Sequence, residues 1–183
     1  LGLAKARDIM GGKENIIAVI GDGSMSGGEA LEGLNVAGEL NSNFIIVFND
    51  NQMSIAENHG GMYDQFAELR RTNGAAENNL FKSMGLDYLY VNDGNDIEAL
   101  IAAFEQVKDS THPVVVHINT LKGKGYAPAE ANKEKWHWHM PFDIQTGQSP
   151  ASGSSESYAS IFAEYALKRA KTDPKFLVLM SAV

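Results

Sequence analysis

The sequence predicts an α/β fold, a parallel sheet with helices on both faces, followed by the start of a second α/β domain. Three short apolar runs rich in β-branched residues support this prediction: Ile16–Ile20, Phe44–Phe48 and Val114–Ile118. Runs that are apolar at every position are typical of parallel strands buried on both faces. The segments between them are long enough for the crossover helices that parallel strands require.

The N-terminal third predicts two helices and two strands. Leu1–Met10 has helical character, and the first strand, Ile16–Ile20, follows it. Glycines come directly after that strand, and a helix is expected from about Gly28 to Leu40. The second strand, Phe44–Phe48, then enters the polar stretch "NDNQMS". This order is a strand, a glycine-rich loop, a helix and a strand.

The middle of the chain continues the alternation. A short helix is predicted over Asn78–Met84 and a strand over Leu86–Val91. Asn95 and Asp96 are suited to cap the next helix. That helix has apolar residues at helical spacing, namely Ile97, Leu100, Ile101, Phe104 and Val107. The strand Val114–Ile118 follows it.

The last third is less regular. Residues 120–153 show no periodicity, and a long irregular stretch of this kind is more often functional or a linker than idle. An amphipathic helix is predicted around Tyr158–Tyr165, and a strand over Phe176–Val183. Because the chain begins in a helical segment and ends in an apolar run, we expect it to be part of a longer polypeptide.

Composition narrows the class of protein. The 183 residues are 44% hydrophobic and 21% charged, with a formal net charge of −8 and no cysteine. No basic block is present, so we expect no nucleic-acid partner. No apolar run is long enough to span a membrane, so we expect no membrane partner either. The lack of cysteine excludes disulfides and suits a cytoplasmic protein.

The loop Gly21-Asp22-Gly23 has two interpretations. In the first it is a dinucleotide site, with Asp50 near the place of a ribose-binding acid. Two details oppose this: Ser26 stands where the third glycine should be, and Asp22 would face the pyrophosphate. Two like charges about 4 Å apart repel by about 4 kcal/mol at the effective dielectric constant of a protein surface.

In the second interpretation a divalent cation lies between Asp22 and a diphosphate, and the carboxylate then becomes favourable. Such an ion needs further oxygen ligands. Asn51 follows the next predicted strand, and the carboxyl ends of adjacent parallel strands meet at one edge of a sheet. We therefore expect a magnesium site with Asp22 and Asn51 among its ligands.

Gly21-Asp22-Gly23, with Asn51 twenty-nine positions after Asp22, resembles the diphosphate-binding motif of thiamine-diphosphate enzymes. Longer stretches resemble the 1-deoxy-D-xylulose-5-phosphate synthases, a transketolase-like family. They are "AVIGDGSMSGGEALEGLNVAGEL", "VFNDNQMSIAEN", "LKGKGYAPAE", "WHWHMPFDIQTG" and "ESYASIFAEYAL". The segment between "SIAEN" and "NNLFKSMGLDY" is shorter than is usual in that family.

The resemblance implies roles for the opening loop and the second turn. It implies that Asp22 and Asn51 ligate Mg²⁺ together with the backbone carbonyl of Met53. Gly23 and Ser24 are implied to hold the diphosphate of thiamine diphosphate. The alternatives that need no function are a turn residue for Asn51 and a core residue for Met53.

Residues farther along are matched in the same way. Ile55 is implied to pack near the cofactor, Lys122 to neutralise diphosphate charge, and Tyr126 to line the site. His137 matches a histidine at the active-site entrance, where it would orient substrate or transfer a proton. His139 lies two residues on; a zinc pair with His137 is a weaker alternative, because no other ligand set is nearby. His59 has no assigned role.

The resemblance implies a thiamine-diphosphate-dependent condensation of pyruvate with glyceraldehyde 3-phosphate that gives 1-deoxy-D-xylulose 5-phosphate and CO₂, in a homodimeric transferase. It divides the chain into a diphosphate-binding domain (1–120), an active-site loop and linker (121–153) and the start of a pyrimidine-binding domain (154–183). Because other parts of that enzyme are missing here, we expect this chain alone to be inactive. The alternatives are a subunit of a split transketolase, or a paralogue with another donor or acceptor, and a non-catalytic nucleotide-binding domain.

Overall fold

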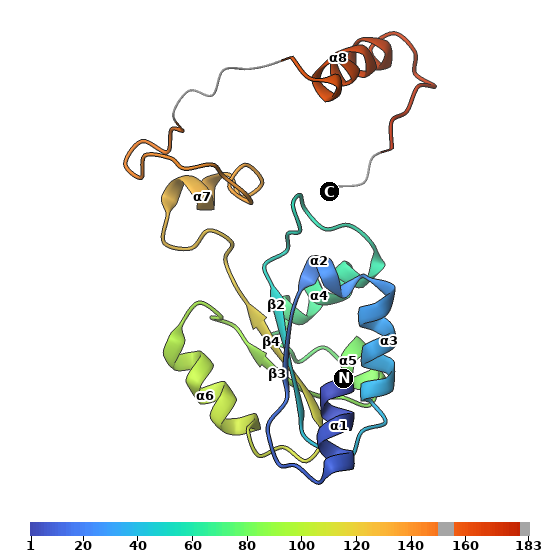
Figure 1. The fold of residues 1–183 in the computed structure, drawn as a ribbon, viewed down its shortest axis with the longest axis vertical. Helices are drawn as coiled ribbons and strands as arrows, with labels where there is room; N and C mark the ends of the chain where they lie inside the picture. The colour runs from blue at the N-terminus through green and yellow to red at the C-terminus, as the bar shows by residue number, and fades with distance from the viewer. Residues whose placement is uncertain (150–155, 180–183) are drawn as a thin grey trace. The chain divides into compact units, whose positions relative to one another are not determined.

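A computed structural model describes residues 1–149 and 156–179 (Figure 1). The chain divides into two compact units, Leu1–His137 and Trp138–Val183, and each is described by itself. The predicted boundaries at residues 120 and 153 remain predictions, because a division by compactness does not test the assignment of domains to roles.

The first unit contains a four-stranded parallel sheet. Its strands are β1 (Ile17–Gly21), β2 (Phe44–Asp50), β3 (Asp87–Val91) and β4 (Pro113–Asn119), in the order β1-β2-β4-β3. All three neighbouring pairs are parallel, as predicted. Because every strand runs the same way, the chain leaves β1 and β2 at the same edge, next to one another (Figure 1).

The helices of the described residues are α1 (Gly2–Met10), α2 (Asp22–Met25), α3 (Gly28–Ala37), α4 (Gly61–Arg71), α5 (Leu80–Ser83), α6 (Ile97–Val107), α7 (Ala127–Ala131) and α8 (Tyr158–Ala170). The sequence did not predict α2, α4 or α7. Two caps act as their residue types indicate. Asn79 Oδ1 accepts from the N–H groups of Phe81 and Lys82, and Asp96 Oδ1 accepts from that of Glu98.

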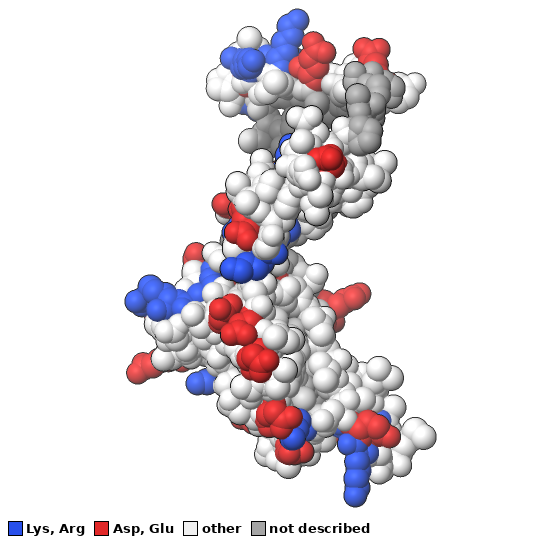
Figure 2. All heavy atoms as spheres, turned by 90° about the vertical axis from the view of Figure 1, so that its left-hand side faces the viewer, with Lys and Arg blue, Asp and Glu red and all other residues white. Residues whose placement is uncertain are grey.

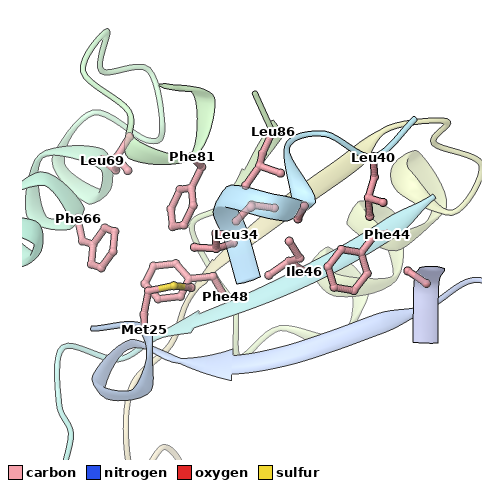
Figure 3. Close-up of a cluster of buried hydrophobic side chains, with 13 residues drawn as sticks. Met25, Leu34, Leu40, Phe44, Ile46, Phe48, Phe66, Leu69, Phe81 and Leu86 are labelled. Atoms are coloured by element: carbon pink, nitrogen blue, oxygen red, sulfur yellow. The ribbon is translucent and has the colours of Figure 1, made fainter. Parts of the chain in front are cut away.

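The side chains of β2 alternate between two cores, so both faces of the sheet are covered at this strand. In β1, by contrast, Ile17 and Val19 are 53% and 73% exposed. Phe44, Ile46 and Phe48 belong to the first core, to which α1 to α5 contribute (Figure 3). Ile45 and Val47 belong to the second, which α6 covers. Period-2 alternation along a strand that is apolar throughout produces this arrangement. The predicted layers, with helices on both faces, are therefore confirmed.

The buried face of α6 differs from the predicted one. Ala103 and Val107 are buried, but Ile97 and Ile101 are 65% and 50% exposed. The spacing rule places all five apolar residues on one stripe, but the stripe that packs into the second core is narrower. The two isoleucines lie at its margin.

In the second unit, α8 confirms the predicted amphipathic helix. It begins with a reciprocal cap, in which Ser157 Oγ accepts from the Ser160 N–H at 3.1 Å and Ser160 Oγ accepts from the Ser157 N–H at 2.9 Å. The predicted strand Phe176–Val183 is wrong over 176–179, which have no strand structure. A strand needs a paired neighbour, and the described residues supply none there. Residues 180–183 lie outside the described residues, as do residues 150–153 at the end of the predicted active-site loop and linker.

The surface shown in Figure 2 has acidic and basic side chains interspersed over a mostly uncharged background. No helix among the described residues is both long enough and apolar enough to cross a membrane.

Candidate functional site

Asp22 lies where β1 ends and is almost fully buried, with 1% of its surface exposed. Its Oδ1 accepts a hydrogen bond from the Gly23 N–H at 2.9 Å. Its Oδ2 is buried and accepts no hydrogen bond. The hydroxyl of Tyr63, on α4, donates to the backbone carbonyl of Asp22 at 3.3 Å. The carboxylate therefore has one satisfied oxygen and one buried oxygen without a partner.

The surroundings disfavour a charge on Asp22. Burial raises the pKa of its carboxyl, and the negative charge of Asp50 raises it further. The N–H groups of Gly23 and Gln52 act in the opposite direction and are outweighed. An unpaired carboxylate in such a place is costly unless it is neutralised. A bound cation would remove this cost.

The turn after β2 lies beside Asp22, because Gly21 on β1 pairs with Asn49 on β2. Asn51 Oδ1 accepts from the Met53 N–H at 3.1 Å. Gln52, between them, has φ = 68°, in the left-handed region that few residues other than glycine adopt. The structure thus brings the predicted ligands Asp22, Asn51 and Met53 to one edge of the sheet. It does not test whether they bind metal.

Gly23 is packed against the next loop. A Cβ at this position would lie 2.8 Å from Cβ and Oγ of Ser54. Ser24 is exposed, and Ile55 is half-buried in the same loop as Ser54. The Gly23 N–H, expected to face a diphosphate, donates to Asp22 in this structure. Its predicted role, like those of Ser24 and Ile55, stays a prediction.

This packing makes Gly23→Ala a sharp test of the local geometry. The added methyl group has to displace Ser54, so the unfolding free energy should fall by about 1–3 kcal/mol. Gly33→Ala is the matched control, since Gly33 lies inside α3 with no atom within 4 Å of its Cβ position. That variant should gain about 0.5–1 kcal/mol. Urea denaturation of both variants checks the result, and equal effects would contradict it.

Lys122 joins the loops around this edge. Its Nζ donates to the carbonyl of Ser54 and, at 2.8 Å, to Nδ1 of His137. Burial lowers the pKa of Lys122, Lys133 lowers it further, and the charge of Asp22 opposes both. Because an ammonium group only donates, His137 Nδ1 accepts, and in the neutral ring the proton is on Nε2. Two residues matched to the site from separate segments are therefore in contact.

The remaining predicted residues make other contacts. The ring of Tyr126 meets that of Trp136 edge to face, with centroids 5.1 Å apart. His59 lines a cavity of about 840 Å³ beside α4 and α7. His139 belongs to the second unit and its Nδ1 lies 2.9 Å from the Met140 carbonyl oxygen. Within the described residues, no three His, Cys, Asp or Glu side chains form a metal cluster. The predicted Mg²⁺ ligands include only one carboxylate, so they would not form such a cluster.

Sequence reasoning missed a buried polar group behind the site. His117 Nε2 lies 2.9 Å from Asp50 Oδ2, and Arg70 Nη1 donates to the same oxygen. The hydroxyl of Tyr88 lies 2.7 Å from His117 Nδ1. A histidine inside an apolar strand is most simply structural, and the sequence indicated Asp50 only as a candidate ribose-binding acid. Two signals were available: His117 interrupts an apolar strand and Asp50 ends another, and both strands end at the same edge of the sheet.

The comparisons with known proteins decide the family. The profile described as 1-deoxy-D-xylulose-5-phosphate synthase matches residues 1–78 and 70–120. The chain belongs to this family. The two matched pieces overlap over residues 70–78, from the end of α4 to just before α5.

Curated relatives agree over the whole chain. The 1-deoxy-D-xylulose-5-phosphate synthase of Desulforudis audaxviator is 36% identical over 219 aligned positions, and synthase 1 of Geobacter sulfurreducens is 37% identical over 222. Both alignments cover 100% of this chain and 34% of the relative. The chain therefore spans about a third of the length of these relatives.

Among solved structures, an enzyme from Mycobacterium smegmatis described as thiamin diphosphate-dependent is similar at a TM-score of 0.47 and 18% identity. That comparison covers 66% of this chain and 20% of the other. The fold assignment rests on the strand order and pairing described above, not on this similarity.

Proposed function

We propose that this chain supplies the Mg²⁺- and diphosphate-binding part of a thiamine-diphosphate-dependent transferase. The reaction we propose is the decarboxylative condensation of pyruvate with glyceraldehyde 3-phosphate, giving 1-deoxy-D-xylulose 5-phosphate and CO₂. The observation that carries this proposal is the buried, unpartnered Oδ2 of Asp22 at the carboxyl end of β1. The family assignment supports this reaction, and the orphaned oxygen gives a physical reason for a cation at this position.

The residues present fit Mg²⁺. Asp22 offers a carboxylate oxygen that lacks any other partner, and Asn51 and the Met53 carbonyl are neutral oxygen donors in the adjacent turn. Mg²⁺ prefers six oxygen ligands, and proteins commonly provide few of them, leaving the rest to phosphates and water. One buried carboxylate with neutral oxygen donors in the adjacent turn therefore suits a magnesium diphosphate.

Lys122 and His137 suit the binding of the diphosphate and of a substrate. Its ammonium group would offset diphosphate charge, and it fixes the ring of His137 through Nδ1. His137 is exposed, and because Nδ1 accepts from Lys122, Nε2 is left to donate a hydrogen bond to an oxygen of a bound substrate. Thiamine diphosphate, when bound, supplies the carbon nucleophile and electron sink for loss of CO₂.

Titration calorimetry tests the proposal. Thiamine diphosphate should bind in the presence of Mg²⁺ and at least about 100-fold more weakly without it, because the Asp22 carboxylate then repels the diphosphate. NAD is the comparison ligand for the dinucleotide alternative. Tighter binding of NAD than of thiamine diphosphate would refute the proposed function.

The transketolase alternative receives no support from the curated relatives reported above, which are 1-deoxy-D-xylulose-5-phosphate synthases. Release of CO₂ from pyruvate, dependent on glyceraldehyde 3-phosphate, would support the synthase reaction. Transfer from a ketose phosphate without CO₂ would favour a transketolase. We also propose a homodimer and a cytoplasmic location, which sedimentation and fractionation can test.

A further inference from the structure

A chain of buried polar contacts runs across the sheet behind the candidate metal site. It passes from Tyr88 on β3 to His117 on β4 and from there to Asp50 at the end of β2, with contacts of 2.7 and 2.9 Å. His117 is 0% exposed and Asp50 is 1% exposed. Arg70, on α4, closes the chain by donating to Asp50 Oδ2.

The direction of each hydrogen bond follows from the surroundings. Burial opposes a charge on Asp50, but the bonds from His117 and Arg70 outweigh it and hold the pKa of that carboxyl below its usual range. Burial lowers the pKa of His117 and raises that of Tyr88. The histidine is therefore neutral: its Nε2–H donates to Asp50, and its Nδ1 accepts from the Tyr88 hydroxyl.

The other carboxylate oxygen of Asp50 faces the candidate site. Asp50 Oδ1 accepts from the Gln52 N–H at 3.2 Å, and this is the residue with φ = 68°. A left-handed conformation costs a residue other than glycine about 1 kcal/mol or more, so it needs support from its neighbours. Asp50 supplies that support only if its own carboxylate is held in place. His117 and Arg70 hold it from the opposite side.

We propose that Tyr88, His117 and Asp50 are positioning residues that fix the left-handed turn at Gln52 and so place the Asn51 and Met53 oxygens for the cation. This inference rests on the proposed function for its ligand. The three residues do not touch the cation; they act through the backbone of the turn. Partners that orient metal ligands in this way typically change metal affinity 10- to 100-fold when altered.

Two replacements of His117 separate positioning from general stability. His117→Gln keeps a donor close to the place of Nε2, whereas His117→Asn keeps a polar group at the place of Nδ1 and loses the donor to Asp50. We expect His117→Asn to weaken Mg²⁺-dependent binding of thiamine diphosphate by about 10- to 100-fold. His117→Gln should stay within about threefold of the unmodified chain. Tyr88→Phe, a milder change, should lose about three- to tenfold.

A second readout needs no ligand. Hydrogen exchange at the Gln52 amide should be faster in His117→Asn than in His117→Gln, because Asp50 no longer holds that N–H. Arg7→Met is the matched control: Arg7 is 8% exposed and donates to the Asn43 carbonyl at 2.7 Å, by the start of β2. It should lower the melting temperature without changing cofactor affinity or Gln52 exchange.

The outcomes distinguish the two proposals. If the unmodified chain binds no thiamine diphosphate with Mg²⁺, the proposed function fails, and Gln52 exchange alone decides the positioning role. If the unmodified chain binds and His117→Asn binds equally well with unchanged exchange, the positioning inference is overturned. It is also overturned if Arg7→Met loses as much affinity as His117→Asn at a comparable loss of stability.

Discussion

Asp22→Asn is expected to abolish Mg²⁺-dependent binding of thiamine diphosphate and to make the ligand-free chain more stable. The binding loss should exceed about 100-fold, roughly 2.7 kcal/mol, because the only carboxylate of the predicted ligand set is removed. The gain in stability has a separate cause. Burial and the charge of Asp50 both disfavour the Asp22 carboxylate, and asparagine removes that charge.

The sign of the pH dependence follows from the raised pKa of Asp22. The folded chain binds this proton more tightly than the unfolded chain, so the carboxyl costs stability as pH rises above the usual value of 3.8. The advantage of Asp22→Asn should therefore be full at neutral pH and disappear in acid, below that value. Melting curves and calorimetry between pH 3 and pH 7 measure both effects.

A control with the opposite electrostatics is Asp143→Asn in the second unit. Hydrogen bonds from Thr146 lower the pKa of the Asp143 carboxyl. Its replacement should change no cofactor affinity and should give no gain in stability. Unchanged binding by Asp22→Asn would eliminate the magnesium site proposed here. A loss of stability at neutral pH would show that the carboxylate is compensated within the ligand-free chain.

The sheet could be predicted from sequence because its signals are local. Three of the four strands are short β-branched runs, and such a run is recognisable without knowing its neighbours. The strand predicted at the end of the chain was wrong because its signal was also purely local. Phe176–Leu179 has the composition of a strand but lacks a paired strand in the described residues, and composition cannot supply one.

The part of the candidate site formed by Asp22 and Asn51 could be predicted from a single sequence motif. Asp22 and Asn51 stand at the ends of two predicted strands, and the parallel order brings them together. The contacts behind them were not predictable in the same way. His117 lies 67 residues from Asp50 in sequence, and the two side chains meet because β4 is the neighbour of β2. That adjacency depends on the strand order, which the apolar runs do not encode.

The left-handed turn at Gln52 could not be predicted from the sequence either. Glycine is the residue that usually marks such a conformation, and here a glutamine adopts it. The buried carboxylate of Asp50 accepts from the Gln52 N–H and supports a conformation that usually requires glycine. For the same reason, the sequence indicated Asp50 as a ribose-binding candidate and not as a residue that supports this turn.

Asp50→Ala is expected to lower the free energy of unfolding by about 3–5 kcal/mol. The change leaves His117 with a buried N–H donor that has no acceptor, and it leaves the Arg70 guanidinium, whose side chain is 18% exposed, without its carboxylate. It also releases the Gln52 N–H. Chemical denaturation gives the free energy, and the double variant Asp50→Ala/Arg70→Met should lose less than the sum of the two single changes.

The pH dependence separates this effect from simple cavity formation. Because the pKa of Asp50 is lowered in the folded chain, its contribution is present above 3.8 and is lost as pH falls through the folded value. The difference between the unmodified chain and Asp50→Ala should therefore shrink in acid, whereas a packing defect would persist. Asp8→Ala is the control, since Asp8 also accepts from an arginine and a hydroxyl but lies at the surface. Its loss should be much smaller. A similar loss for Asp8 and Asp50, or a loss for Asp50→Ala that does not depend on pH, would mean that the buried charge does not stabilise this edge of the sheet.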